Sequence, residues 1–187
     1  MIKNVIFDIG NVLLDFCWKD HIARFGFQGE KADRIAQAMM LGPIWPKLDL
    51  GLESDEDILE QFVAHTPELE QEIRLVFSDL STIVREYEGS VDWIESLKAR
   101  GYHTYYLSNY GARIRREASK ELSFLSHMDG GIMSYTVHLA KPDPAIYQTL
   151  LDRYGLKAEE CVFLDDTVRN VEAAQALGIA GIVVTSQ

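Results

Sequence analysis

The sequence is poor in residue types that several protein classes need. Its 187 residues include two cysteines, Cys17 and Cys161, and neither belongs to a CxxC pair, so we expect neither a disulfide-rich scaffold nor a zinc site. Basic residues are also scarce: 18 Lys and Arg stand against 29 Asp and Glu, a formal net charge of −11. This balance argues against nucleic acid or an anionic membrane as a partner, because both attract clustered Lys and Arg.

Long apolar segments are missing as well. No charge-free stretch approaches the roughly 20 residues that cross a bilayer, and Asp8 interrupts the apolar start too early for a secretory signal. The composition, with 47% hydrophobic and 25% charged residues, is that of a chain able to bury a sizeable core. We therefore expect a cytoplasmic protein with one domain of ordinary size and room for a modest insertion.

Short apolar runs separated by helical patterns indicate the fold. Four strong runs and one weak run cover residues 3–8, 103–107, 161–164, 179–184 and, weakly, 131–134. Helical patterns, each followed by a glycine, cover residues 91–100, 142–154 and 168–177. Unbroken Val, Ile, Leu and Phe suit strands buried on both faces of a parallel sheet. The alternation predicts a doubly wound, Rossmann-like α/β fold.

This alternation stops after the first apolar run. From Asp15 to about Gly89 the sequence has helical patterns only, over residues 30–41, 54–65 and 68–87, with Ser54 as the expected N-cap of the second. We predict an α/β core domain formed by residues 1–14 and 88–187, interrupted by an all-helical insertion of residues 15–87.

Polar side chains follow three of the predicted strands, and a lysine precedes a later helix. These residues are Asp8, Ser108, Asn109, Lys141, Asp165 and Asp166. Ligands of parallel α/β sheets bind at the carboxyl ends of the strands, so we expect these groups at one rim. Each alone could be a turn or cap residue. The adjacent carboxylates of Asp165 and Asp166, however, repel each other unless a cation lies between them.

Four segments, in order, resemble the motifs of the haloacid dehalogenase (HAD) superfamily, whose members are mostly phosphatases that form an aspartyl-phosphate. The segments are Val5 to Val12 (VIFDIGNV), Tyr106 to Asn109 (YLSN), Ala140 to Pro144 (AKPDP) and Val162 to Asp166 (VFLDD). They extend across the whole chain. The resemblance implies that the insertion of residues 15–87 is a helical cap domain, in which Trp45 could line a substrate pocket.

The resemblance also implies roles for individual residues. Asp8 would be the nucleophile, and Ser108, Asn109 and Lys141 would bind the phosphoryl group, with Asn109 at a helix N-terminus. Magnesium prefers oxygen ligands. Its implied ligands are Asp8, the Gly10 carbonyl, Asp165 and Asp166, with Asn170 orienting a metal-bound water.

One position departs from the family pattern. Family phosphatases usually carry a second aspartate two residues after the nucleophile, and Gly10 stands there. Glycine cannot transfer protons, a contribution of ~10²–10⁴-fold, so water, the substrate or a cap residue must supply it. Asp15, Asp20 and His21 are unranked candidates. The glycine variant resembles sugar phosphatases of subfamily IA, of the glucose-1-phosphatase kind.

We therefore predict a magnesium-dependent hydrolase of a small phosphomonoester, for example a sugar phosphate, acting as a monomer or homodimer. One alternative is a metal-independent 2-haloacid dehalogenase, in which Arg24 or Arg34 would bind the substrate carboxylate; the pair Asp165-Asp166 argues against it. Another is a binding or regulatory module that keeps the fold without useful turnover. The joint retention of the nucleophile, the lysine and the paired acids argues against that module.

Overall fold

Five of the short apolar runs form one parallel sheet. The computed structural model describes residues 1–185. The strands are β1 (Asn4–Phe7), β4 (His103–Ser108), β5 (Gly130–Met133), β6 (Cys161–Asp165) and β7 (Ala180–Val183). They lie in the order β5-β4-β1-β6-β7, and every neighbouring pair is parallel. The predicted Rossmann-like α/β fold is confirmed.

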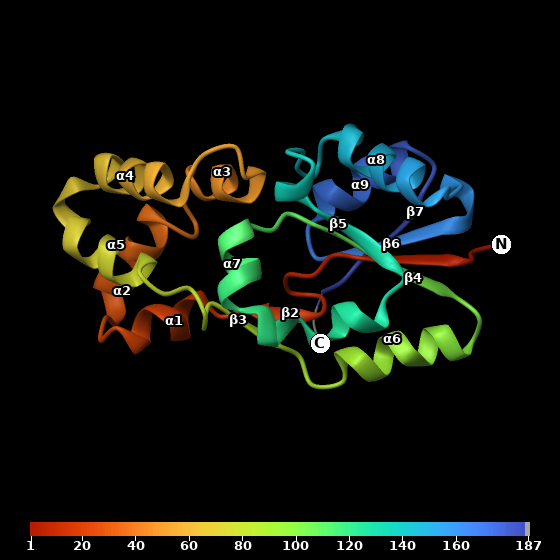
Figure 1. Cartoon of the computed structure of the whole chain (residues 1–187), viewed down its shortest axis with the longest axis horizontal. Coiled ribbons are helices and arrows are strands. Elements are labelled where there is room, and N and C mark those ends of the chain that lie inside the picture. Colours follow the sequence, from red (N-terminus) through yellow and green to blue (C-terminus); the bar gives the residue numbers. More distant parts are fainter. Residues whose placement is uncertain (186–187) are drawn as a thin grey trace.

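Helices cover both faces of this sheet (Figure 1). One face carries α6 (Ser90–Ala99) and the 3-10 segment η2 (Ser119–His127), which follows α7 (Ala112–Glu117); the other carries α8 (Pro144–Tyr154) and α9 (Val168–Ala176). Successive residues of β1 point to opposite faces. Ile6 packs among side chains of α8 and α9, whereas the Phe7 ring meets Trp93 of α6 edge-on, with ring centroids 4.9 Å apart. The short segments η3 (Ser134–Thr136) and η4 (Ala158–Glu160) precede α8 and β6.

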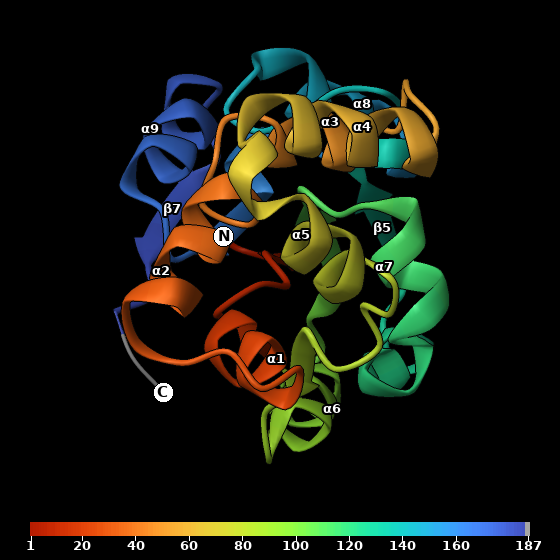
Figure 2. The same ribbon diagram turned by 90° about the vertical axis from the view of Figure 1, so that its left-hand side faces the viewer.

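The insertion, which we call the cap segment (residues 15–87), contains five helices (Figures 1 and 2). They are α1 (Trp18–Arg24), α2 (Gly29–Ala38), α3 (Trp45–Leu50), α4 (Asp55–His65) and α5 (Glu70–Phe77), with η1 (Pro67–Leu69) before α5. Ser54 caps α4 as predicted: its hydroxyl accepts a hydrogen bond from the Asp57 backbone N–H at 3.1 Å. The division into two domains at these residues stays a prediction.

The expectation of helical structure only in this segment was wrong at its two ends. Residues 68–87 do not form one helix, because α5 ends at Phe77 and Val84–Glu86 form strand β3. The Asp79 carboxylate accepts from the Ser81 N–H at 2.9 Å, a local bond that competes with helix continuation. Strand β3 pairs antiparallel with β2 (Leu14–Phe16). Three residues are too few for a readable strand pattern.

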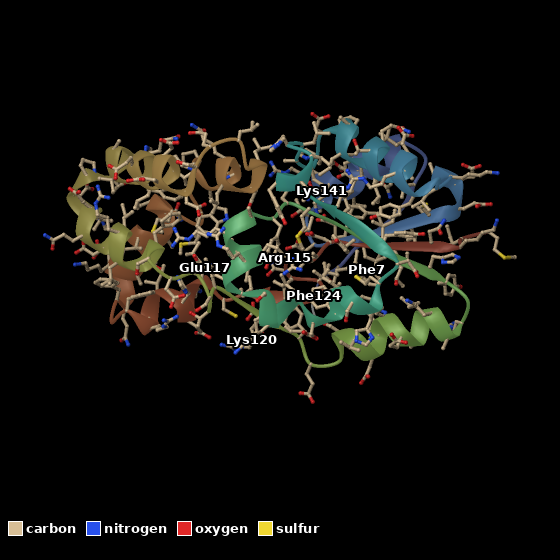
Figure 3. The ribbon with its side chains drawn as sticks, in the orientation of Figure 1. Phe7, Arg115, Glu117, Lys120, Phe124 and Lys141 are labelled. Carbon is tan, nitrogen blue, oxygen red and sulfur yellow. The ribbon has the colours of Figure 1, made fainter. Side chains whose placement is uncertain are left out.

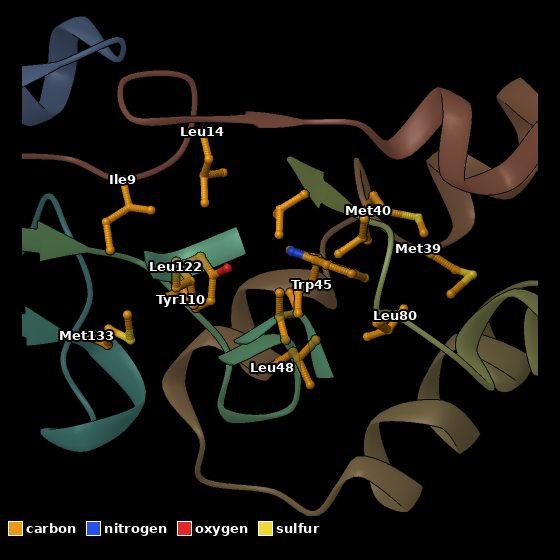
Figure 4. Close-up of a cluster of buried hydrophobic side chains, with 14 of the residues drawn as sticks. Ile9, Leu14, Met39, Met40, Trp45, Leu48, Leu80, Tyr110, Leu122 and Met133 are labelled. Carbon is orange, nitrogen blue, oxygen red and sulfur yellow. The ribbon is translucent and has the colours of Figure 1, made fainter. Parts of the chain in front are cut away.

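One continuous cluster of buried apolar side chains joins the cap segment to the α/β core. It includes Phe7 and Phe124 of the core and Ile35 and Phe62 of the cap segment, all fully buried. Figure 4 shows the part of it around Trp45. Among residues 1–185, no helix has the length and hydrophobicity that a bilayer crossing needs.

Candidate active site

The strand ends bring the predicted site residues to one edge of the sheet. Asp8 follows β1, whose last residue, Phe7, pairs with Tyr106 in β4 and Leu164 in β6. The Asp8 N–H donates to the Leu164 carbonyl at 2.7 Å, which fixes the nucleophile candidate beside β6. Figure 3 shows Lys141 at the same edge, the one that faces the cap segment. This is the carboxyl edge, where α/β proteins bind ligands.

Lys141 lies between two buried carboxylates. Its Nζ is 2.8 Å from Asp8 Oδ1 and 2.6 Å from Asp165 Oδ2, and all three residues are buried. Burial alone would lower the pKa of Lys141, but the two carboxylates outweigh it and raise that pKa, so the ammonium stays charged. Burial raises the pKa of Asp8 to about 6 against the opposing effect of Lys141.

The two adjacent aspartates have different surroundings. Both oxygens of Asp165 accept hydrogen bonds from the Asn170 amide at 3.1 Å, and Oδ1 also accepts from the Thr167 N–H at 2.7 Å. Asp166 is half-buried and accepts from the Asn11 amide at 2.9 Å and from the Thr167 hydroxyl at 3.2 Å. Asp165 is therefore occupied by donors, whereas Asp166 keeps more of its lone pairs for a ligand.

The carboxylates fit a hard divalent cation. One oxygen from each of Asp8, Asp165 and Asp166 lies within 4.8 Å of the other two. Three oxygen donors of this kind suit Mg²⁺, which binds through carboxylates while keeping several waters. The Asn170 Oδ1 is buried and has no hydrogen-bond partner among the described residues, so it could accept from a metal-bound water.

Ser108 and Asn109 act on different residues of the site: Ser108 on Asp8, and Asn109 on Lys141. The buried Ser108 hydroxyl acts on the Asp8 carboxylate and lowers its pKa in part. Asn109 instead holds Lys141: its amide donates to the Lys141 carbonyl at 3.0 Å and accepts from the Lys141 N–H at 2.8 Å. The expectation that Asn109 begins a helix was wrong, because α7 starts at Ala112.

A pocket of about 240 Å³ opens above these groups, between the α/β core and the cap segment. Its apolar walls are Leu14, Phe16, Trp45, Val84 and Ile114. Its polar lining is Asp8, Gly10, Asn11, Asp49, Asn109, Tyr110, Asp166 and Thr167. Trp45 thus both packs in the buried apolar cluster and lines the pocket. A Cβ added at Gly10 would meet no atom within 4 Å.

The three acid–base candidates near the first motif do not line this pocket. The Asp15 carboxylate accepts from the Cys17 thiol at 3.1 Å, and Asp20 pairs with Arg85 at 3.2 Å on the surface. His21 is fully buried, 2.9 Å from the Thr82 hydroxyl. Sequence reasoning missed Asp49, Asn11 and Tyr110. Asn11 lies inside the first motif, but Asp49 carries no sequence signal.

With the fold and this geometry in place, comparison with known proteins identifies the family. The family model of haloacid dehalogenase-like hydrolases matches residues 2–178, and the chain belongs to that family.

Individual relatives include both phosphatases and dehalogenases. The chain is 26% identical to the sesquiterpene phosphatase astK of Aspergillus oryzae, covering 98% of this chain and 90% of the relative. It is 24% identical to the (S)-2-haloacid dehalogenase 1 of a Pseudomonas species, covering 95% and 82%. A crystal structure of a HAD family enzyme from Bacteroides thetaiotaomicron, in complex with magnesium and inorganic phosphate, superposes with a TM-score of 0.75 at 21% identity, covering 100% and 96%. The structural likeness supports the fold.

Proposed function

We propose that this hydrolase is a magnesium-dependent phosphatase that cleaves a small phosphomonoester through an aspartyl-phosphate on Asp8. The observation that carries the proposal is the set of three carboxylates whose oxygens lie within 4.8 Å of one another beside a buried lysine. The negative charge of these carboxylates would repel an anionic substrate. A bound Mg²⁺ would offset the charge of both the carboxylates and the phosphate. Asp8, Asp165 and Asp166 would hold the ion together with the Gly10 carbonyl.

The residues of the α/β core would divide the work of phosphoryl transfer. Asp8 attacks phosphorus, and the leaving-group oxygen departs on the opposite side, toward the pocket. Ser108 and Lys141 donate hydrogen bonds to the phosphoryl oxygens, which carry more charge in the transition state. Asn109 keeps Lys141 in place, and Asn170 orients Asp165 and a metal-bound water.

The substrate would be small, because the pocket holds about 240 Å³. A sugar phosphate fits this volume, and aromatic walls such as Trp45 and Phe16 can pack on the face of a sugar ring. Gly10 in the first motif supports a place in subfamily IA near the glucose-1-phosphatase-like enzymes.

The dehalogenase alternative has less support. Arg24 and Arg34, offered for a substrate carboxylate, form ion pairs with Asp79 and Glu68 and do not line the pocket. The binding-module alternative also has less support, because a module without turnover would not need the buried ion pairs that Lys141 forms with Asp8 and Asp165.

We further propose a cytoplasmic enzyme that acts as a monomer or homodimer on a small phosphorylated metabolite, without nucleic acid or membrane partners. Its free, buried cysteines and its net charge of −11 support this.

Hydrolysis of an aryl phosphate tests the proposed function. Wild type and Asp8→Asn are compared in Mg²⁺ and in chelator, and released phosphate is measured. We expect Mg²⁺-dependent release that the substitution abolishes, followed by selectivity in a sugar-phosphate panel. Chloride release from chloropropionate without metal, and no phosphate release from any substrate, would instead support the dehalogenase.

A further inference from the structure

The pocket offers few groups that could exchange a proton with the leaving group. The titratable side chains in its lining are Asp8, Asp49, Tyr110 and Asp166. Asp8 is the proposed nucleophile, and Asp166, which accepts a hydrogen bond from the Asn11 amide, is a proposed ligand of the metal. Burial raises the pKa of Tyr110 above its usual range, which makes it too weak an acid to protonate an alkoxide well. Asp49, on the cap helix α3, is the remaining group.

Hydrogen bonds to the backbone carbonyls of Asp49 and its neighbour fix the position of Asp49 beside the pocket. The buried Ser134 hydroxyl donates to the Asp49 carbonyl at 2.5 Å and accepts from the Tyr110 N–H at 2.9 Å. The neighbouring Leu50 carbonyl is 2.9 Å from Nδ1 of His138. The end of α3 is thus tied to the loops that follow β4, which pairs with β1, and β5, the next strand along the sheet.

Close contact at the end of α3 reinforces this position. Gly51 has a φ of 65°, and a Cβ there would lie 2.8 Å from the Tyr135 Cβ, so only glycine fits. Leu48 packs against Gly111, and Trp45 and Leu48 of the same helix are in Figure 4 with Tyr110. The backbone is therefore fixed on both sides of Asp49.

The Asp49 carboxylate itself has no hydrogen bond or ion pair with any residue from 1 to 185, although its residue lines the pocket with Asp8. A carboxylate whose backbone is bound and whose oxygens are unpaired is available to a ligand. We propose that Asp49 is the catalytic acid and base of this enzyme, supplied by the cap segment in place of the carboxylate that Gly10 lacks. This proposal rests on the phosphatase function proposed above.

The proton balance of the two steps is complete. As Asp8 bonds to phosphorus and the bond from phosphorus to the leaving oxygen breaks, the Asp49 carboxylic acid gives its proton to that oxygen. Water then attacks the aspartyl-phosphate, the Asp49 carboxylate takes its proton, and the Asp8–phosphorus bond breaks to release phosphate. Asp49 is left protonated for the next turnover.

The charges around Asp49 agree with this role. Burial, and then the charge of Asp8, raise the pKa of Asp49 to about 7, with Lys141 opposing them. Both protonation states are therefore populated near neutral pH, which suits a group that donates and then accepts.

First-turnover kinetics with two leaving groups test the role. Wild type, Asp49→Asn and the exposed cap variant Glu53→Gln are mixed rapidly with dinitrophenyl phosphate or phenyl phosphate in Mg²⁺. Dinitrophenolate leaves without a proton, and phenolate needs one. With Asp49→Asn we expect a near-normal first turnover of dinitrophenyl phosphate, a steady state slowed ~10²-fold, and phosphorylated Asp8 detected by mass spectrometry. With phenyl phosphate the first turnover itself should slow by a similar factor, and Glu53→Gln should match wild type.

A second variant separates chemistry from folding. Gly10→Asp added to Asp49→Asn places a carboxylate in the open space at residue 10 and should restore much of the steady-state rate. Equal rates for Asp49→Asn and wild type, or equal slowing of the first turnover for both substrates, would overturn the assignment of Asp49. A wild type that hydrolyses neither ester, or an active Asp8→Asn enzyme, would instead overturn the proposed phosphatase.

Discussion

The two walls of the pocket are built differently. On the α/β core wall, the charges of Asp8, Lys141 and Asp165 are buried and paired with one another. On the cap wall, Trp45 presents an apolar surface and Asp49 an unpaired carboxylate. The core wall is therefore organised before any ligand arrives, whereas the carboxylate of the cap wall has no partner among residues 1–185. Pre-organised charge suits the step common to all substrates, and the cap wall suits the part that differs between them.

The largest effect should come from removing the central cation of the core wall. Lys141→Met leaves two buried carboxylates without a counter-charge, and we expect a loss of about 3–5 kcal/mol in the free energy of unfolding at pH 8, together with the loss of activity. The loss should shrink toward pH 5, because Asp8 can then take up a proton. Urea unfolding at the two pH values measures it.

A surface lysine provides the matched control. Lys3→Met breaks an exposed pair with Glu160 and should cost less than about 1 kcal/mol. Equal costs for Lys3→Met and Lys141→Met would show that the core wall does not depend on its buried ion pairs.

A smaller loss of stability is expected from Ser134, which connects the cap wall to the core wall. Ser134→Ala removes the hydroxyl that links the Asp49 carbonyl to the Tyr110 N–H and leaves buried polar groups unpaired, at a cost of about 1–3 kcal/mol. Because Asp49 also loses its anchor, kcat should fall more than KM rises. The exposed Ser126→Ala should change neither stability nor kinetics, and a Ser134→Ala enzyme indistinguishable from it would contradict the link.

The last effect belongs to the cap wall and has the opposite sign, because here the substitution should raise the stability of the folded state. The pKa of Asp49 is raised from its ordinary 3.8 to about 7 in the folded protein. Between these values the folded state holds a proton that the unfolded chain releases, so stability falls as the pH rises through this range. In chelator, Asp49→Asn should therefore be more stable than wild type at pH 8, by up to about 4 kcal/mol, and equal to it below pH 3.8. Thermal unfolding across this range measures the difference; an Asn variant less stable than wild type at pH 8 would be the contrary result.

The contrast between the walls also decides what could be predicted from the sequence. The core wall follows from local signals: buried runs give the strands, and their carboxyl ends carry Asp8, Ser108 and Asp165. The cap wall does not. Asp49 sits in a six-residue helix, and only the docking of α3 through Ser134 and Gly51 brings it to the site. The strands β2 and β3 were missed because three residues each show no period.

The antiparallel pairing of those two strands has a consequence for the architecture as a whole. Phe16 faces Val84 across the ribbon, so the chain leaves the α/β core and returns to it at one point. Seen from the sheet, the helices from α1 to α5 are the loop of a single β-hairpin. A loop closed at its base can be lengthened, shortened or exchanged at little cost to the strands it connects. The hairpin therefore separates the pairing of the parallel strands from the length of the cap segment.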